Sequence, residues 1–228
     1  MNKSKLFRPT LCIAIATLLS GCIGGSGSGG GSGGGGSGDF ETNYDAASGK
    51  APTSDMPTQL QANYGGQFKS GVSGGGSVAG INENVEIIGD LDVAVDWTDG
   101  QSTNPFTGTA SNIVVTDVVD GGSETLGGTL TVDNGIGGTI MRVATPASNI
   151  GGISVPAIET GSFQFGMTGQ LSGSEGDLDA TVLVGGNFHG PGAESMVGVV
   201  SGGFKEVGST NPAIFDAGIG GVAYLNRE

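Results

Sequence analysis

The clearest hydrophobic–polar pattern in the chain runs from Gly89 to Trp97. Its apolar and polar side chains alternate, with Leu91, Val93, Val95 and Trp97 set against Asp90, Asp92, Ala94 and Asp96. A period of two places the apolar side chains on one face of a strand and the carboxylates on the other. A helix would instead spread these apolar residues around its whole circumference. The pattern therefore predicts a half-buried antiparallel strand.

Weaker forms of the alternation predict further strands, rich in Val, Ile, Thr and Phe, at residues 64–68, 106–116, 125–132, 139–143, 162–171, 179–188 and 196–204. Turn signals lie between them at residues 99–100, 120–122, 133–135, 151–152 and 190–192. About eight strands at hairpin spacing predict an antiparallel sandwich or a closed barrel. Glycines within strands, such as Gly108 and Gly166, favour the barrel because tight curvature needs positions without a side chain. We therefore expect an all-β fold, a single antiparallel up-and-down β-barrel of about eight strands.

The charge balance adds information about partners. The 228 residues carry 22 acidic and 8 basic side chains, a formal net charge of -14. A membrane-embedded barrel is disfavoured because the carboxylates at Asp90, Asp92 and Asp96 would face lipid. Nucleic-acid binding is also disfavoured, because neutralising phosphates requires a Lys/Arg surface. An acidic surface suits solubility, separation from an anionic membrane or a basic partner.

The first 21 residues have the order of a secretory signal peptide. Lys3, Lys5 and Arg8 precede an apolar run at residues 11–19, and small residues lead to Cys22. The run is shorter than the roughly 20 residues that span a bilayer. Residues 19–22 resemble the lipobox of bacterial lipoproteins, which implies that Cys22 is acylated and becomes the first mature residue. The alternative is an ordinary secretory signal with an incidental cysteine.

Removing residues 1–21 would also remove three basic side chains, so the net charge becomes 5 − 22 = −17. Residues 22–61 then follow as a linker, almost pure glycine and serine at first and still without apolar periodicity after Asp39. Such a composition predicts a disordered tether, with a root-mean-square reach of about 30–35 Å. Residues 62–228 form the predicted barrel domain, which is long enough for a sizeable core.

Several predicted strands also resemble a known family. The stretch GDLDVAVDW followed by FTGTASNIVV is similar to paired strands in the β-barrel domain of transferrin-binding protein B and related surface lipoproteins. The later stretch GGNFHGPGAESMVGVVSGGF resembles another strand of that family, and YGGQFKSG at Tyr64 resembles its first strand. The matching positions are Gly108, Thr109, Asn112, Gly186, Phe188, Gly190, Pro191, Ala193 and Glu194.

The resemblance implies a lipid-anchored protein of the Gram-negative outer membrane, exposed on the cell surface. It further implies a non-catalytic binding protein that captures a host or environmental protein, or an iron or haem carrier, for nutrient uptake. One alternative is a surface interaction protein, such as an adhesin or a binder of complement regulators. Another is a small-ligand binder, if the barrel interior is lined by small residues rather than filled by Phe, Ile and Val. No cofactor is expected.

Catalytic and metal-binding patterns are weak. His189 is the only histidine and lies in a predicted Gly-Pro turn, and residues 71–75 match G-x-S-x-G without a strand-to-helix context. Calcium could use Asp90, Asp92 and Asp96, or Asp117 and Asp120, although a solvated strand face and ordinary turns explain them as well. His189 could ligate haem, or it could simply replace the family's aromatic residue. We expect no enzyme activity.

Apolar side chains also occur in predicted loops, at residues 104–106, 150–158, 211–212 and 214–215. If several of them lie at one mouth of the barrel, they would form an exposed patch for a protein partner. The alternative is that they plug the barrel ends.

Overall fold

The computed structural model describes residues 37–73 and 77–228. The signal peptide, Cys22 and the first part of the tether, residues 22–36, lie outside the described residues. One helix, α1 (Ser37–Ser48), precedes the strands. The strands are β1 (Gln59–Ser73), β2 (Val85–Thr98), β3 (Phe106–Asp117), β4 (Ser123–Thr125), β5 (Gly127–Gly128), β6 (Leu130–Val132), β7 (Gly138–Thr145), β8 (Ser148–Ile150), β9 (Ile153–Val155), β10 (Ile158–Gly173), β11 (Gly176–His189), β12 (Ser195–Glu206) and β13 (Ala217–Arg227).

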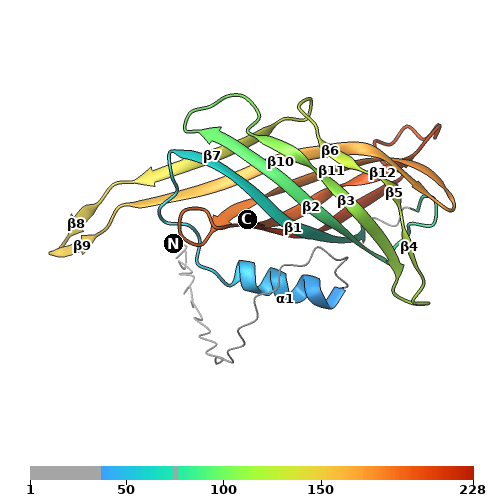
Figure 1. Ribbon diagram of the computed structural model, residues 1–228, viewed down its shortest axis with the longest axis horizontal. Helices are drawn as coiled ribbons and strands as arrows, with labels where there is room; N and C mark the ends of the chain where they lie inside the picture. The colour runs from blue at the N-terminus through green and yellow to red at the C-terminus, as the bar shows by residue number, and fades with distance from the viewer. Residues whose placement is uncertain (1–36, 74–76) are drawn as a thin grey trace, which may run out of the picture. The chain divides into compact units, whose positions relative to one another are not determined.

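The strands close into an antiparallel ring, in which β11, β12, β13, β1, β2, β3, β6 and β10 follow one another and β10 pairs with β11 again (Figure 1). Each long strand pairs with its neighbour in sequence, except that β13 returns to β1, from Tyr64 opposite Arg227 to Ser73 opposite Gly218. This arrangement confirms the predicted up-and-down β-barrel of about eight strands. All five predicted turn regions lie between strands.

The alternation predicted in residues 89–97 is confirmed in β2. Leu91, Val93, Val95 and Trp97 are buried inside the barrel, whereas Asp92 and Asp96 are exposed on its outer wall. The core also holds Tyr64 and a group of large apolar side chains, Phe68, Phe106, Phe165, Phe188, Phe204, Met56, Ile81, Ile87 and Ile113. The interior is thus filled by aromatic and branched side chains, the arrangement that excludes a ligand.

One segment of the barrel wall differs from the predicted strand. Residues 125–132 were expected to form one strand, but the wall between β3 and β10 consists of short pieces. Strand β4 pairs with β3. Strands β5 and β7 pair with β10, and β6 pairs with both β3 and β10. Gly127 and Gly128 belong to this segment, and Gly128 has a φ of 102° that breaks a regular strand.

The N-terminal side of the barrel also differs from the expected linker at residues 37–61. α1 lies against the outer wall, where Phe40 and Ala47 are fully buried with Val197 and Tyr224. These helical residues follow the spacing i, i+7, with Tyr44 between them at i+4. After the helix, residues 49–58 continue across one end of the barrel and lead directly into β1.

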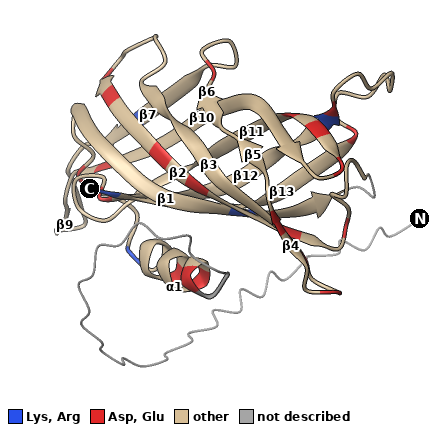
Figure 2. Ribbon diagram, turned by 45° about the vertical axis from the view of Figure 1, so that its right-hand side comes forward, with Lys and Arg blue, Asp and Glu red and all other residues tan. Residues whose placement is uncertain are grey.

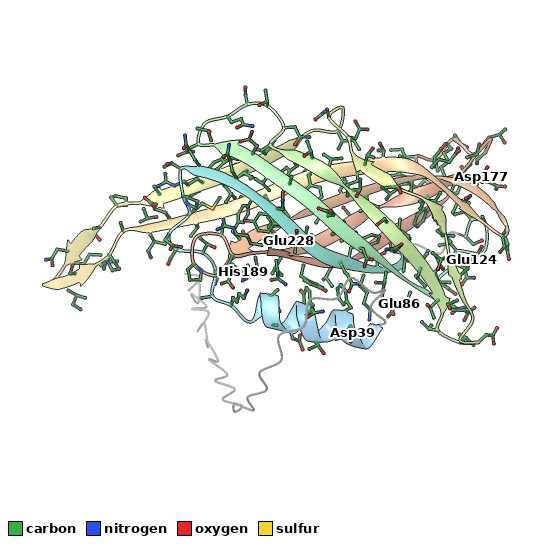
Figure 3. The ribbon with its side chains drawn as sticks, viewed as in Figure 1. Asp39, Glu86, Glu124, Asp177, His189 and Glu228 are labelled. Carbon is green, nitrogen blue, oxygen red and sulfur yellow. The ribbon has the colours of Figure 1, made fainter. Side chains whose placement is uncertain are left out.

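The two ends of the barrel are named here by what they carry. The arm end holds residues 49–58, the loop 99–105, the hairpin formed by β7 to β10 and the loop 190–194. The opposite end holds the loops 118–122, 174–175 and 207–216. Figure 3 shows His189 and Glu228 near the arm end, and Glu124 and Asp177 near the opposite end.

Candidate functional site

A β-hairpin projects from the arm end and is called the arm below; it comprises residues 142–161 (Figure 1). Its root is the pairing of β7 with the start of β10, from Arg142 opposite Gly161 to Thr145 opposite Ile158. Its tip is the separate two-stranded sheet of β8 and β9. Gly151 and Gly152 join these strands with φ values of 62° and 87°, which suit a tight hairpin turn.

The tip of the arm has an apolar and a polar face. Ile150 pairs with Ile153, and Ser148 pairs with Val155, so these side chains share one face. Asn149 and Ser154 form the next pair and point to the other face. An amphipathic ribbon of this kind is suited to lie with one face against another surface.

Exposed apolar side chains occur at the root of the arm as well as at its tip. Met141, Val143, Ile150, Ile153 and Ile158 retain 59%, 53%, 68%, 71% and 38% of their accessible surface. Residues 143–158 contain no charged side chain, in a chain with a net charge of −14. The strand β9 is accordingly tan in Figure 2, where Lys and Arg are blue and Asp and Glu are red. The arm therefore combines several exposed apolar side chains with an absence of charge in residues 143–158.

Arg142 fixes the root of the arm to the barrel. Its guanidinium donates to the Met56 carbonyl at 2.9 Å and to the Asp99 carboxylate at 3.1 Å, and it pairs with Glu159. The hydrogen bond to Glu159 raises the pKa of Arg142, and the charges of Glu159 and Asp99 add to the effect against burial. Three segments of the chain therefore meet at one side chain beneath the arm.

Residues 49–58 close the barrel beside this root and are called the plug. Thr53 N–H donates to the Phe188 carbonyl at 2.9 Å, and the Thr53 hydroxyl donates to the Gly190 carbonyl at 2.7 Å. Met56 N–H donates to the Glu159 carbonyl at 2.8 Å. Both Thr53 and Met56 are buried. The plug thus connects the end of β11 with the start of β10.

The predicted family-motif residues Gly190, Pro191, Ala193 and Glu194 form the loop over this same end. Tyr64 donates its hydroxyl to the Ala193 carbonyl at 2.6 Å. Glu194 pairs with Lys50 of the plug at 2.9 Å. Pro191, Gly190, Pro52 and their neighbours line an open hollow of about 400 Å³. The structure therefore brings these motif residues together with the plug, where they hold the end of the barrel closed.

The remaining motif residues lie in the barrel wall. A Cβ on Gly108 would approach the Asp92 carbonyl oxygen to 2.2 Å, and one on Gly186 would approach the Val197 carbonyl oxygen to 2.0 Å. Asn112 has a φ of 50° and donates to Asp90 at 2.9 Å. Thr109 lies on the outer side of β3, and Phe188 is buried in the core. Their visible contacts are structural, and none lies in the arm.

His189 and the candidate calcium carboxylates are engaged in protein contacts. The His189 Nδ1 atom lies 2.9 Å from the Lys50 carbonyl oxygen. Asp90 accepts hydrogen bonds from Gln67 and Asn112. Asp117 accepts from the backbone of Asp120 and Val119, and these bonds lower its pKa. Within residues 37–73 and 77–228, no group of three His, Cys, Asp or Glu side chains is arranged to hold a metal ion.

The predicted apolar loops are divided between the two ends. Residues 104–106 and 150–158 belong to the arm end, but Phe106 is buried in the core. Ile214 is 81% exposed at the opposite end. Met141 and Val143 lie within a predicted strand and were not recognised as site residues. Their signal was the alternation of exposed apolar side chains with Arg142 on β7.

Comparisons with protein-family models, with curated proteins and with solved structures find no match. In the described part of the chain, no helix has the length and apolar character needed to cross a bilayer.

Proposed function

We propose that this protein is a non-catalytic binding module that captures a protein partner through the arm. The observation that carries the proposal is the uncharged apolar ribbon at residues 143–158, exposed beyond a barrel whose own interior is filled. Large exposed apolar patches on otherwise polar proteins mark sites of interaction. The anchored root at Arg142 supports this role, because a fixed arm loses little conformational freedom on binding.

The arm can supply a useful share of binding energy. Complete burial of an aliphatic side chain is worth about 1.5–3 kcal/mol. Ile150 and Ile153 are 68% and 71% exposed. Covering both would therefore contribute roughly 2–4 kcal/mol, which corresponds to about 30- to 1000-fold in affinity.

The proposal includes attachment to the outer membrane through a lipid on Cys22, with the domain on the cell surface. The N-terminal half of α1 supports this arrangement. Glu41 pairs with Lys69, which also pairs with Glu86 near the opposite end of the barrel. Figure 3 places Asp39 and Glu86 at this same side. The described chain therefore begins near the opposite end of the barrel, away from the arm.

The partner we favour is a host or environmental protein, such as an iron or haem carrier, captured for nutrient uptake. The support for that choice is the resemblance of residues 108–112 and 186–194 to the transferrin-binding protein B family. The same arm would also serve an adhesin or a binder of complement regulators. A small ligand inside the barrel is less favoured, because Trp97, Phe165 and their neighbours occupy that space.

The test is capture from serum by the full chain, compared with the double variant I150S/I153S. Val199 is 63% exposed on the wall strand β12 and provides the matched control V199S. We expect the double variant to lose the captured protein and V199S to retain it. Equal capture by all three chains would refute a role for the arm.

Attachment and exposure are tested separately. C22S should move the protein out of the membrane fraction, and protease added to intact cells should digest the unmodified protein. Retention of C22S in the membrane would contradict the lipid anchor. Resistance to protease in intact cells would contradict display on the surface.

A further inference from the structure

We infer that the partner presents an apolar surface bordered by lysine or arginine side chains, so that it matches both the arm and its acidic root. This inference rests on the proposed function and specifies the chemistry of the partner. The apolar part follows from the four exposed apolar side chains of the arm, Val143, Ile150, Ile153 and Ile158. The basic part follows from the charges that surround the root.

The root of the arm carries more negative than positive charge. Asp99 and Glu159 share a single cation, Arg142. Asp55 lies beside them, because its backbone forms a bridge to Glu159, and its carboxylate accepts only a backbone hydrogen bond from Gly192 among its described contacts. Three carboxylates and one guanidinium therefore leave an excess of two negative charges where the arm begins.

Of the five basic side chains in the described chain, Arg142 and Arg227 lie at this root, and the charge of the adjacent Glu228 offsets that of Arg227. Lys50 pairs with Glu194, Lys69 with Glu41 and Glu86, and Arg142 with Asp99 and Glu159. Lys205 donates to two carbonyl groups of its own loop, and Arg227 donates to the Gly192 carbonyl. The 22 acidic side chains outnumber these five basic ones, so a negative field remains for a basic partner to offset.

A single partner segment can reach both the apolar side chains and the acidic root. From Val143 to Ile150 the arm extends roughly 25 Å at the usual rise of a strand. A segment that covers the tip and extends back along the arm would place one of its flanks beside Asp55 and Glu159. Apolar contacts in the centre with charged contacts at the rim are the usual division of a protein interface.

Two other occupants fit less well. A second copy of this chain would bring the same negative root. Addition of a partner strand to the edge of β8 or β9 is restricted, because each strand has three residues and Pro146 and Pro156 interrupt the adjacent ladder. The side-chain face of the arm, rather than its backbone edge, is therefore the binding surface.

The experiment uses three synthetic peptides with one shared apolar centre, flanked by lysine, serine or glutamate. Each is labelled with a fluorophore, and its binding to the full chain is followed by anisotropy. At 50 mM salt we expect the lysine-flanked peptide to bind about fivefold more tightly than the serine-flanked one, and the glutamate-flanked peptide to bind most weakly. At 500 mM salt the three affinities should agree within about twofold.

Two pairs of variants locate the contacts. I150S/I153S should weaken all three peptides, whereas V199S should leave them unchanged. D55N removes a root charge but keeps an oxygen that can accept from Gly192, so it should weaken only the lysine-flanked peptide, by about two- to threefold. D179N, on the exposed face of β11 toward the opposite end, is its matched control and should have no effect.

Equal binding of the lysine- and serine-flanked peptides would overturn the inference, as would binding that ignores I150S/I153S or a failure of all three peptides to bind. Formation of a dimer that depends on Ile150 and Ile153 would overturn it in favour of a second copy. Serum capture decides the proposed function independently. A protein captured through the arm without any dependence on salt would refute the basic rim and leave the proposed function standing.

Discussion

Replacing Phe40 with alanine should release α1 from the barrel without unfolding the barrel itself. Phe40 is fully buried although its helix lies on the outer wall. Its ring centroid lies 5.4 Å from that of Tyr224 and 5.8 Å from that of Tyr44. Lys69 Nζ lies 5.9 Å from the centre of the Phe40 ring and also pairs with Glu41 of the helix. Phe40 therefore takes part in both the apolar and the charged contacts that hold α1 on the barrel.

The expected loss is comparable with the whole docking energy of the helix. Burial of a phenylalanine contributes about 1.5–3 kcal/mol. Each aromatic pair adds about 0.5–1.5 kcal/mol, and an exposed cation–π contact adds about 0.5–1 kcal/mol. These contributions sum to about 3–7 kcal/mol, a range that includes the roughly 3–5 kcal/mol usual for removing a buried phenylalanine. Because α1 has 12 residues and is marginal alone, we expect it to undock and unfold rather than leave a cavity.

Hydrogen exchange measured by mass spectrometry distinguishes these outcomes. In F40A, the amides of residues 37–48 should exchange at least about 30-fold faster, corresponding to a loss of 2 kcal/mol or more. Strands β2 and β11 should keep their protection. The control is A46Q, an exposed position of the same helix where a good helix former should change stability by less than about 0.5 kcal/mol. Unchanged protection of α1 in F40A would refute the assigned role.

Three further predictions concern the barrel and the root of the arm. G66A should prevent folding, because its Cβ would approach the Tyr224 carbonyl oxygen to 2.0 Å, whereas G220A meets no atom within 4 Å and should fold; circular dichroism checks both. R142Q should speed hydrogen exchange in residues 142–161 while β2 stays protected, and equal exchange would refute the anchoring role. Burial raises the pKa of Tyr64 above its ordinary 10.0, against the nearby Arg227, so urea stability should fall as the pH rises through the folded pKa. Y64F should reduce that pH dependence to the part that Tyr224 contributes, since burial also raises the pKa of Tyr224, and should cost about 1–3 kcal/mol at pH 8 because the Ala193 carbonyl loses its donor.

The regular strands of the barrel could be predicted because their apolar side chains alternate. In β2, four apolar positions face the core and the intervening carboxylates face outward, as the sequence indicated. Alternation indicates that one face of a strand is buried, and each wall strand of a barrel buries the face that points inward. The closing strand β13 was not among the predicted strands. Gly218, Gly220 and Gly221 interrupt its alternation, and a Cβ on Gly221 would approach the Lys69 carbonyl oxygen to 2.0 Å.

The helix α1 was missed because its helical signal is short. Phe40, Tyr44 and Ala47 have the right spacing, but glycine, asparagine and aspartate around them are poor helix formers. The helix depends on a wall made by Val197, Val222 and Tyr224, which lie far away in sequence. Local propensity cannot report a surface that exists only after the barrel has formed.

The candidate site was predictable only in part. The apolar content of residues 150–158 and the Gly151–Gly152 turn were visible in the sequence. The projection of these residues beyond the barrel, and the meeting of Arg142 with Asp99 and Met56, depend on tertiary contacts. The motif residues at 190–194 differ, because the sequence identified them in advance. They were recognised by resemblance, and the structure assigns them to closure of the barrel end.

The pairing of β13 with β1 has a consequence for the order of folding. These strands join residues 64–73 to residues 218–227, whereas the other long strands pair along successive hairpins. The ring stays open until β13 has been synthesised, so both β1 and β12 keep an unpaired edge before then. Until then both edges can pair with another chain, and the sheet loses them together only when its 11-residue closing strand arrives.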